Sequence, residues 1–269
     1  MDLKIKDKVA LVTGSNSGIG KAIARQLAEE GARVIIHGRN EKRVHETVGQ
    51  LTQDGLEAFG VIGDLGTDEE AAQVVQQVHD QVDRVDILVN NAGVYDYATW
   101  DTVTTEDWEK TLNIDVLSAV RLIQAFLPAM KEAGWGRIIQ IGSGTGHQPF
   151  ATIPQYGALK AAMNNMTVSL ARDLGDCGVL TNVVTPGLIY SKSVETHFRN
   201  YQKEHDYDWG SSWQEIEKGV TTDYLKNDTG KLGKPADVAA VVALLASPLS
   251  SFVSGANWRV DGGSSLAIN

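Results

Sequence analysis

The chain has 269 residues, of which 42% are apolar, enough to bury one large core. Its formal charge of −10 at pH 7 argues against a nucleic-acid partner held by phosphate contacts. Cys177 is the only cysteine, which excludes an internal disulfide. No signal peptide is evident, and the longest apolar run, residues 238–246, is too short to span a bilayer, so we expect a cytoplasmic protein with no membrane partner and no metal site.

Short apolar runs alternate with amphipathic helical patterns along the chain. Strands are predicted at residues 9–12, 33–36, 57–62, 86–90, 137–141, 180–184 and 257–260. Helices are predicted from residue 19 to about 30, 41–53, from residue 67, 105–133, 154–174 and 235–246. This alternation predicts an α/β fold in which a mainly parallel, seven-stranded sheet is covered by helices on both faces.

Residues 192–233 break the alternation and are predicted to form a helical insertion within a single domain that spans residues 1–269. The insertion is rich in aromatic residues, which either line an apolar pocket under a mobile lid or pack the helices of the lid itself or a subunit interface. These aromatics are Phe198, Tyr201, Tyr207, Trp209, Trp213 and Tyr224. Its acids are expected to form a solvated face, and they are Glu195, Glu204, Asp206, Asp208, Glu215 and Glu217.

Three glycines, Gly14, Gly18 and Gly20, lie between the first strand and the first helix. In a dinucleotide-binding loop such glycines permit a tight turn, a close approach to pyrophosphate and close packing of helix on strand. The pyrophosphate is then bound by free N–H groups at the positive end of the helix. We therefore predict that residues 14–20 bind a dinucleotide; a tight turn without a ligand is the alternative.

The residues after the second strand predict which dinucleotide is bound. NAD-binding folds place an acid here, whereas this chain has His37, Gly38, Arg39 and Asn40. Because the Arg39 guanidinium is planar and permanently charged, it suits a 2′-phosphate, so we predict NADP rather than NAD. Arg39 as a solvated surface cation is the alternative, and His37 is interpreted as a packed or surface histidine.

Tyr156 and Lys160 lie one turn apart on a predicted helix. An ammonium beside a phenol favours the phenolate, so this pair suits proton transfer near neutral pH. The spacing alone also fits an ordinary surface pair, and the other motifs of the chain decide between these interpretations.

Several motifs occur in the same order as in the short-chain dehydrogenase/reductase family, which the sequence therefore resembles. Within that family it is most similar to ketoreductases of the 3-oxoacyl-ACP reductase type. The resemblance rests on the glycine loop 13–20, Asn90-Asn91-Ala92-Gly93, Ser143 and the Tyr156/Lys160 pair. It also rests on Asn113, matched to an asparagine in a helix of the family, and on Pro186-Gly187 after the sixth strand.

The resemblance implies a Rossmann-type, doubly wound domain and nicotinamide-dependent oxidoreduction, commonly by a homotetramer or homodimer. It implies the following cofactor-binding residues: Gly14, Ser15, Asn16, Ser17, Gly18, Ile19, Gly20, Arg39, Asn40, Asp64, Leu65, Asn91, Ala92, Gly93, Tyr156, Lys160, Pro186, Gly187, Ile189 and Ser191. It also implies that residues 94–100, residues 144–150 and the insertion face a small carbonyl or alcohol substrate.

These residues suit the interconversion of a carbonyl and a secondary alcohol by hydride transfer from the cofactor. We expect Ser143 to bind the substrate oxygen and Tyr156 to act as general acid/base. The resemblance implies that Lys160 tunes Tyr156 and holds the ribose, and that Asn113 fixes a water beside Lys160. Two alternatives are an NADP(H) sensor without turnover and an epimerase or dehydratase acting on nucleotide-sugars.

Overall fold

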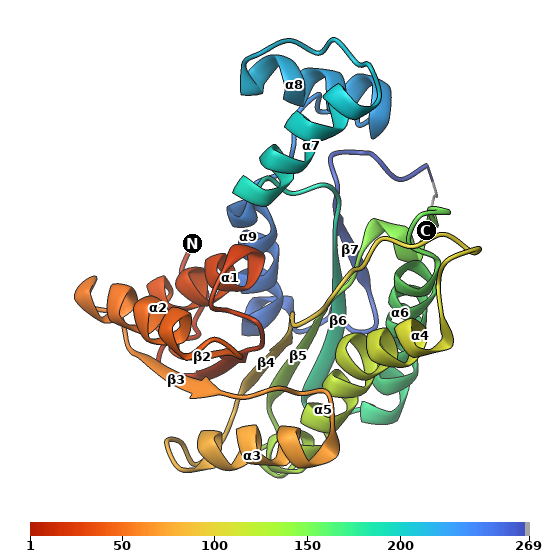
Figure 1. The fold of residues 1–269 in the computed structure, drawn as a ribbon. Helices are drawn as coiled ribbons and strands as arrows, with labels where there is room; N and C mark the ends of the chain where they lie inside the picture. The colour runs from red at the N-terminus through yellow and green to blue at the C-terminus, as the bar shows by residue number, and fades with distance from the viewer. Residues whose placement is uncertain (267–269) are drawn as a thin grey trace.

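A computed structural model describes residues 1–266 (Figure 1). The strands are β1 (Val9–Val12), β2 (Arg33–Gly38), β3 (Ala58–Ile62), β4 (Ile87–Asn90), β5 (Gly136–Ile141), β6 (Val179–Pro186) and β7 (Asn257–Val260). They form one sheet in the order β3-β2-β1-β4-β5-β6-β7, and every strand pair is parallel. The predicted seven-stranded sheet of Rossmann type is therefore confirmed.

The helices are α1 (Gly18–Glu29), α2 (Glu41–Gln53), α3 (Asp68–His79), α4 (Thr105–Leu112), α5 (Ser118–Glu132), α6 (Pro154–Leu174), α7 (Lys192–Glu204), α8 (Trp213–Gly219) and α9 (Pro235–Ala246). Short 3-10 turns are η2 (Gly144–Gly146) and η4 (Pro248–Ser250), and π-helical turns are η1 (Asn113–Leu117) and η3 (Val220–Tyr224). The predicted start of α3 is confirmed, because the Thr67 hydroxyl accepts a hydrogen bond from the N–H of Glu70.

Two apolar cores lie on opposite faces of the sheet. One joins Ala10 and Val12 of β1 to α1, α2 and α9, and the other joins Val9 and Leu11 of the same strand to α3, α5 and α6. Alternate residues of a strand point to opposite faces, so a strand buried on both sides must be apolar throughout. This is why the apolar runs in the sequence identify the central strands.

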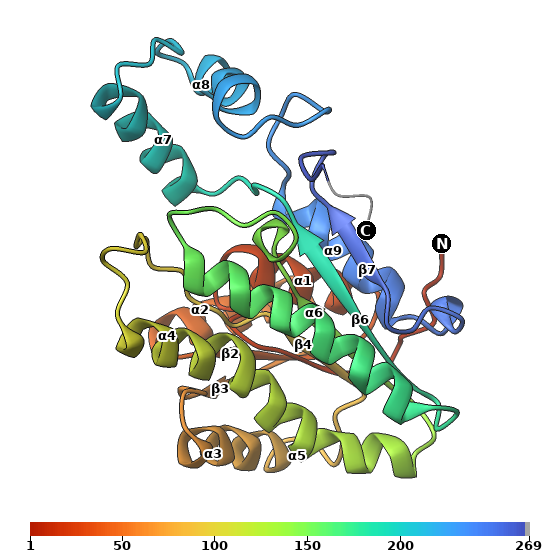
Figure 2. The same cartoon turned by 90° about the vertical axis from the view of Figure 1, so that its right-hand side faces the viewer.

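The strand order reverses direction between β1 and β4, whose register pairs Leu11 with Leu88. At such a switch point the loops after two neighbouring parallel strands run to opposite faces and leave a crevice at the carboxyl ends. Helices α7 and α8 stand apart from the sheet, beyond the carboxyl end of β6 (Figure 2).

One helical stretch among residues 1–266, Thr105–Glu132, has the length and apolar content of a membrane span. It comprises α4, η1 and α5, and its side chains Leu122, Phe126 and Met130 belong to the second core. These three side chains pack on the sheet.

Candidate active site

A cavity of about 960 Å³ lies at the carboxyl ends of the strands. Its wall contains residues that directly follow β1, β2, β4, β5 and β6, among them Gly14, Arg39, Asn91, Gly142 and Gly187. Parallel strands bring these loops together although they are far apart in the sequence.

The glycine loop forms one end of this cavity. Gly14 has a φ of +63°, in the left-handed region that favours glycine. A Cβ added to Gly20 would lie 2.6 Å from the Gly14 carbonyl oxygen, so this position also requires glycine. The N-cap residue Ser17 makes no side-chain cap, which leaves the first N–H groups of α1 available to an anion.

His37 and Ser15 hold the glycine loop from behind. The N–H of Gly14 donates to His37 Nδ1 at 3.1 Å, and the N–H of His37 donates to the Ser15 hydroxyl, which itself donates to the Val12 carbonyl. Ser15 is fully buried and does not line the cavity, so its predicted contact with the cofactor does not fit its position. It links β1 to β2 instead.

Burial lowers the pKa of His37 to about 4, so the imidazole is neutral at pH 7. Because Nδ1 accepts from Gly14, we assign the proton to Nε2. Of the two interpretations of His37, packed or surface, the structure shows the packed one, and the ring also supports the loop. The hydrophobic strand pattern around His37 was the signal for its burial.

Arg39 and Asn40 line the cavity next to the glycine loop. Arg39 is exposed, and its guanidinium donates to the Asp64 carboxylate at 3.3 Å. Asn40 caps α2 by accepting from the N–H of Arg43, a second cation in the cavity wall that sequence reasoning missed. The structure therefore places two guanidinium groups at this end of the cavity.

The segment after β4 is tied to the glycine loop by Thr13. Its hydroxyl accepts from the N–H groups of Asn91 and Ala92, and the Asn91 amide donates to the Thr13 carbonyl at 2.8 Å. Asn91, Ala92 and Gly93 line the cavity, as do Asp64 and Leu65 after β3. These hydrogen bonds fix the spacing between the loops after β1 and β4.

Ser143, Tyr156 and Lys160 share another part of the wall. The Ser143 hydroxyl accepts from the N–H and the hydroxyl of Thr145, at 3.3 and 2.9 Å, which leaves its own O–H free to donate. The Lys160 ammonium is 5.4 Å from the centre of the Tyr156 ring and donates to the Ile141 carbonyl at 3.1 Å. The serine, phenol and ammonium thus face the same cavity.

The expected role of Asn113 does not fit the structure. Its amide donates to the Glu109 carbonyl and accepts from Arg121, and it does not line the cavity. The residue beside Lys160 is instead Asp115, whose carboxylate lies 3.3 Å from the ammonium. Residues that are two positions apart on a helix point to different sides, so only one of Asn113 and Asp115 can reach Lys160.

The comparisons with known proteins agree with this geometry. Residues 8–202 match the family model for short chain dehydrogenase. The chain belongs to the short-chain dehydrogenase family. It is 36% identical to the uncharacterized oxidoreductase YvaG of Bacillus subtilis, over 98% of both chains. It is 32% identical to a 3-oxoacyl-[acyl-carrier-protein] reductase of Aquifex aeolicus, over 98% of this chain and 99% of that one.

A solved relative is similar over the whole chain. The L-sorbose reductase of Gluconobacter frateurii, solved with NADPH and L-sorbose, superimposes with a TM-score of 0.92 at 31% identity, covering 100% of both chains. The expected family resemblance is thereby confirmed, and the chain is an oxidoreductase by family.

In this short-chain dehydrogenase the segment after β6 completes the cavity. Pro186, Gly187, Ile189 and Ser191 all line it, and Ser191 also caps α7 by accepting from the N–H of Val194. Ile189 forms an isolated parallel bridge with Gly233. This bridge joins the two ends of the segment that carries α7, α8 and η3, here called the α7–α8 lobe (residues 192–233).

The aromatic residues of the α7–α8 lobe divide into two groups. Phe198 and Tyr224 line the cavity. Trp209 is buried in a small core of the lobe, Tyr201 and Tyr207 stack near it, and Trp213 packs against Tyr190. Both functions expected of these rings, cavity lining and packing, are therefore present.

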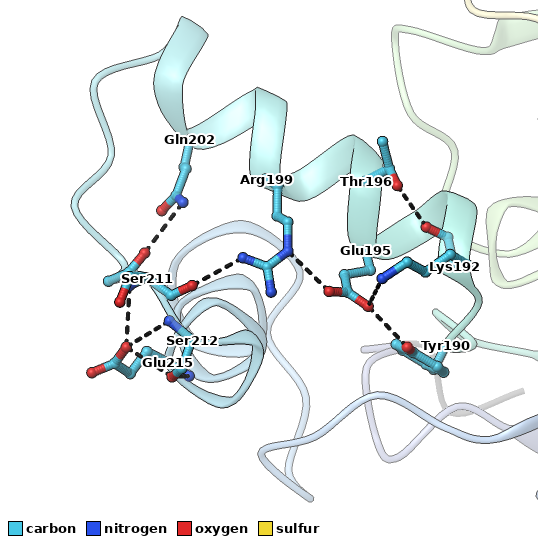
Figure 3. A network of polar contacts seen from close by, with 10 residues as sticks. Tyr190, Lys192, Glu195, Thr196, Arg199, Gln202, Ser211, Ser212 and Glu215 are labelled. Carbon is cyan, nitrogen blue, oxygen red and sulfur yellow. Dashed lines mark hydrogen bonds and ion pairs between the residues drawn. The ribbon is translucent and has the colours of Figure 1, made fainter.

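One acid of this lobe is not part of a solvated face. Glu195 is 7% exposed and accepts from the Tyr190 hydroxyl, Lys192 and Arg199, at 2.9, 3.1 and 2.9 Å (Figure 3). Arg199 also donates to the Ser211 carbonyl, which ties α7 to the segment before α8. Hydrogen bonds from Arg199, Tyr190 and Lys192 lower the Glu195 pKa to about 2.

The other two segments expected near the substrate also contribute to the wall. Tyr95 and Tyr97 come from residues 94–100, and Gln148 and Phe150 come from residues 144–150. Tyr97 stacks on His197 of α7 with ring centres 5.7 Å apart, so the loop after β4 contacts the lobe across the cavity. Residues 1–266 contain no cluster of three potential metal ligands.

Proposed function

We propose that this protein is an NADP(H)-dependent oxidoreductase that interconverts a carbonyl and a secondary alcohol, with Tyr156 as general acid/base. The observation that carries the proposal is the position of Ser143, Tyr156 and Lys160 in a cavity that begins at the glycine loop. A family relative of very similar structure was solved with NADPH and a ketose, which supports both the cofactor and the type of reaction.

The residues present fit a dinucleotide phosphate. The glycine loop offers the uncapped start of α1 to the pyrophosphate, and Arg39 and Arg43 offer cations to a 2′-phosphate. NADPH, when bound, supplies the hydride. By family resemblance, the remaining cofactor contacts come from Asn16, Ser17, Asn40, the segments Asp64–Leu65 and Asn91–Gly93, and Pro186, Gly187, Ile189 and Ser191, all of which line the cavity.

In the reduction direction, Ser143 donates a hydrogen bond to the substrate oxygen as negative charge develops there. Tyr156 donates its phenolic proton to the same oxygen, which becomes the alcohol hydroxyl. The Lys160 ammonium stabilises the phenolate that remains. In the oxidation direction, the phenolate of Tyr156 removes the proton from the alcohol.

The wall combines hydroxyl, amide and imidazole groups with aromatic rings, supplied by Thr145, Gln148, His197, Tyr95 and Phe198. A small polar ketone fits these groups. We also propose that residues 192–233 act as a lid over this cavity within one domain of residues 1–269, since Phe198 and Tyr224 reach its wall from the lobe.

The test is turnover of NADPH, followed by nicotinamide absorbance, with a panel of ketoses, diketones, simple ketones and acyl thioesters. Tyr156→Phe should lower kcat at least about a hundredfold, because general acid catalysis is lost. NADPH binding, followed by fluorescence, should be retained. The control is Tyr207→Phe, a tyrosine in the lobe but outside the cavity wall.

Turnover by Tyr156→Phe at the wild-type rate would contradict the proposal. Binding of NADPH without oxidation of any member of the panel would favour a sensor. Conversion of a nucleotide-sugar, assayed alongside this panel, without net consumption of NADPH would favour an epimerase.

A further inference from the structure

A fully buried carboxylate lies next to the proposed proton-transfer pair. Asp115 comes from the π-helical turn η1, and its side chain is 0% exposed, against 4% for Lys160. Its Oδ1 accepts from the N–H of Val94 at 2.8 Å, while Oδ2 faces the Lys160 ammonium at 3.3 Å. A Cβ added to Gly93, in the cavity wall, would lie 3.1 Å from Oδ2.

The position of Lys160 depends on few contacts. An ammonium has three N–H donors, and here one is directed to the Ile141 carbonyl and one faces Asp115. Ile141 comes from the end of β5 and Asp115 from η1, so two different elements hold the ammonium. They leave the third donor for the side on which Tyr156 lies, 5.4 Å from ring centre to ammonium.

Two other titratable side chains lie near this cluster. Tyr95, in the loop after β4, has its ring 6.0 Å from that of Tyr156. His147, after η2, is engaged with Asn164 and Asn257. Burial alone would lower the pKa of Lys160, but the charges of Tyr156 and Asp115 outweigh it and raise that pKa. Within the described chain, Asp115 is the anion that forms an ion pair with Lys160.

We propose that Asp115 is a positioning residue, which holds the Lys160 ammonium beside Tyr156 and whose negative charge sets the pH range in which Tyr156 exchanges its proton. This inference rests on the proposed function, since it assigns the tuning of the same acid/base. The residue beside Lys160 is then the charged Asp115, and not the neutral Asn113 that the family resemblance implied.

The charge of the buried cluster gives the direction of the effect. With Asp115 ionised, the phenol, ammonium and carboxylate sum to zero, and loss of the phenolic proton leaves a net charge of −1. With a neutral amide at position 115, the same step takes the cluster from +1 to zero. A buried site favours the step that ends neutral, so removal of the carboxylate should let Tyr156 ionise at lower pH.

The experiment compares the wild type with Asp115→Asn, which keeps the shape and an oxygen to accept from Val94 but removes the charge. Tyrosinate absorbance is followed against pH, and the curve of the matching Tyr156→Phe protein is subtracted in each background to isolate Tyr156. Burial raises the pKa of Tyr97 and Tyr224, so these rings ionise later. We expect the Tyr156 midpoint to fall by about one pH unit or more.

The control is Asp173→Asn, which removes an exposed carboxylate from the last turn of the same helix and should leave the midpoint unchanged. An unchanged midpoint or a rise in Asp115→Asn would overturn the inference. If Asp115→Asn does not fold, Asp115→Ser gives the same comparison with a smaller acceptor. This titration needs no substrate, so it can fail while Tyr156→Phe still abolishes turnover, and the two proposals are tested separately.

Discussion

At the residue scale, the functional side chains depend on neighbours that do not touch a ligand themselves. The neutral imidazole of His37 fixes the N–H of Gly14, and Thr13 fixes Asn91 and Ala92. Sequence motifs located the glycines and Asn91, because turns require particular residues. They did not locate Arg43, since only the structure shows that the first turn of α2 directs this residue to the cavity wall.

Arg39 should decide the choice between NADPH and NADH. Loss of a charge-assisted contact to the 2′-phosphate costs about 1.5–3 kcal/mol, so Arg39→Ala should raise KM for NADPH roughly ten- to a hundredfold. KM for NADH should change little. The control is Arg25→Ala, which removes a surface arginine on α1 that pairs with Glu29 and Asp54. Equal changes in both KM values after Arg39→Ala would refute this role.

His37 should make the folded protein sensitive to mild acid. Its pKa falls from 6.5 in the unfolded chain to about 4 in the fold, so the unfolded state binds a proton first as pH decreases. The contribution of neutral His37 to the free energy of unfolding is therefore complete above pH 6.5 and is lost as pH falls through about 4. This loss is roughly 3 kcal/mol in total.

Urea denaturation between pH 7 and pH 4 measures this loss of unfolding free energy. His37→Asn cannot titrate in this range and should show a shallower decline than the wild type. An identical decline in both proteins would assign the effect to other groups.

At the scale of single elements, the helix from Thr105 to Glu132 shows why motif matching misplaced one residue. Its α-helical pattern is interrupted by η1, which adds a residue to one turn and changes which side chains face inward. Asp115 lies on the buried side with Ser118, Ala119 and Leu122. An acid at that spacing within an apolar stripe was the signal in the sequence for a buried carboxylate.

Glu195 should control how the α7–α8 lobe responds to acid. Its lowered pKa means that the folded state holds the carboxylate ionised to a lower pH than the unfolded state does. The contribution of Glu195 is therefore complete above pH 4.5 and is lost as pH falls through about 2. Glu195→Gln should loosen the lobe already at pH 7, because two of its three donors, Lys192 and Arg199, lose an anionic partner.

Hydrogen exchange of residues 192–224 at pH 7 measures this loosening. Exchange should be faster in Glu195→Gln than in the wild type. The control is Glu204→Gln, which changes an exposed acid at the end of the same helix. In this variant residues 192–224 should exchange at the wild-type rate. Unchanged protection in Glu195→Gln would show that the network does not hold the lobe.

At the scale of the whole molecule, the order and type of the elements were readable because the sheet is buried on both faces. Apolar strands such as Val9–Val12 and Ile87–Asn90 alternate with amphipathic helices, a pattern typical of a parallel sheet covered by helices on both faces. The lobe was less readable, since its packing depends on aromatic pairs such as Phe198 and Tyr224, which have no fixed spacing in the sequence. The homotetramer or homodimer implied by the family stays a prediction.

The α7–α8 lobe has a small core of its own, formed by Phe198, Trp209, Ile216, Val220 and Leu232. Its two ends meet at the bridge between Ile189 and Gly233, so the chain leaves and re-enters the sheet layer at nearly one place. Phe198 belongs both to this core and to the cavity wall, so the packing inside the lobe and the shape of the cavity are joined through one ring.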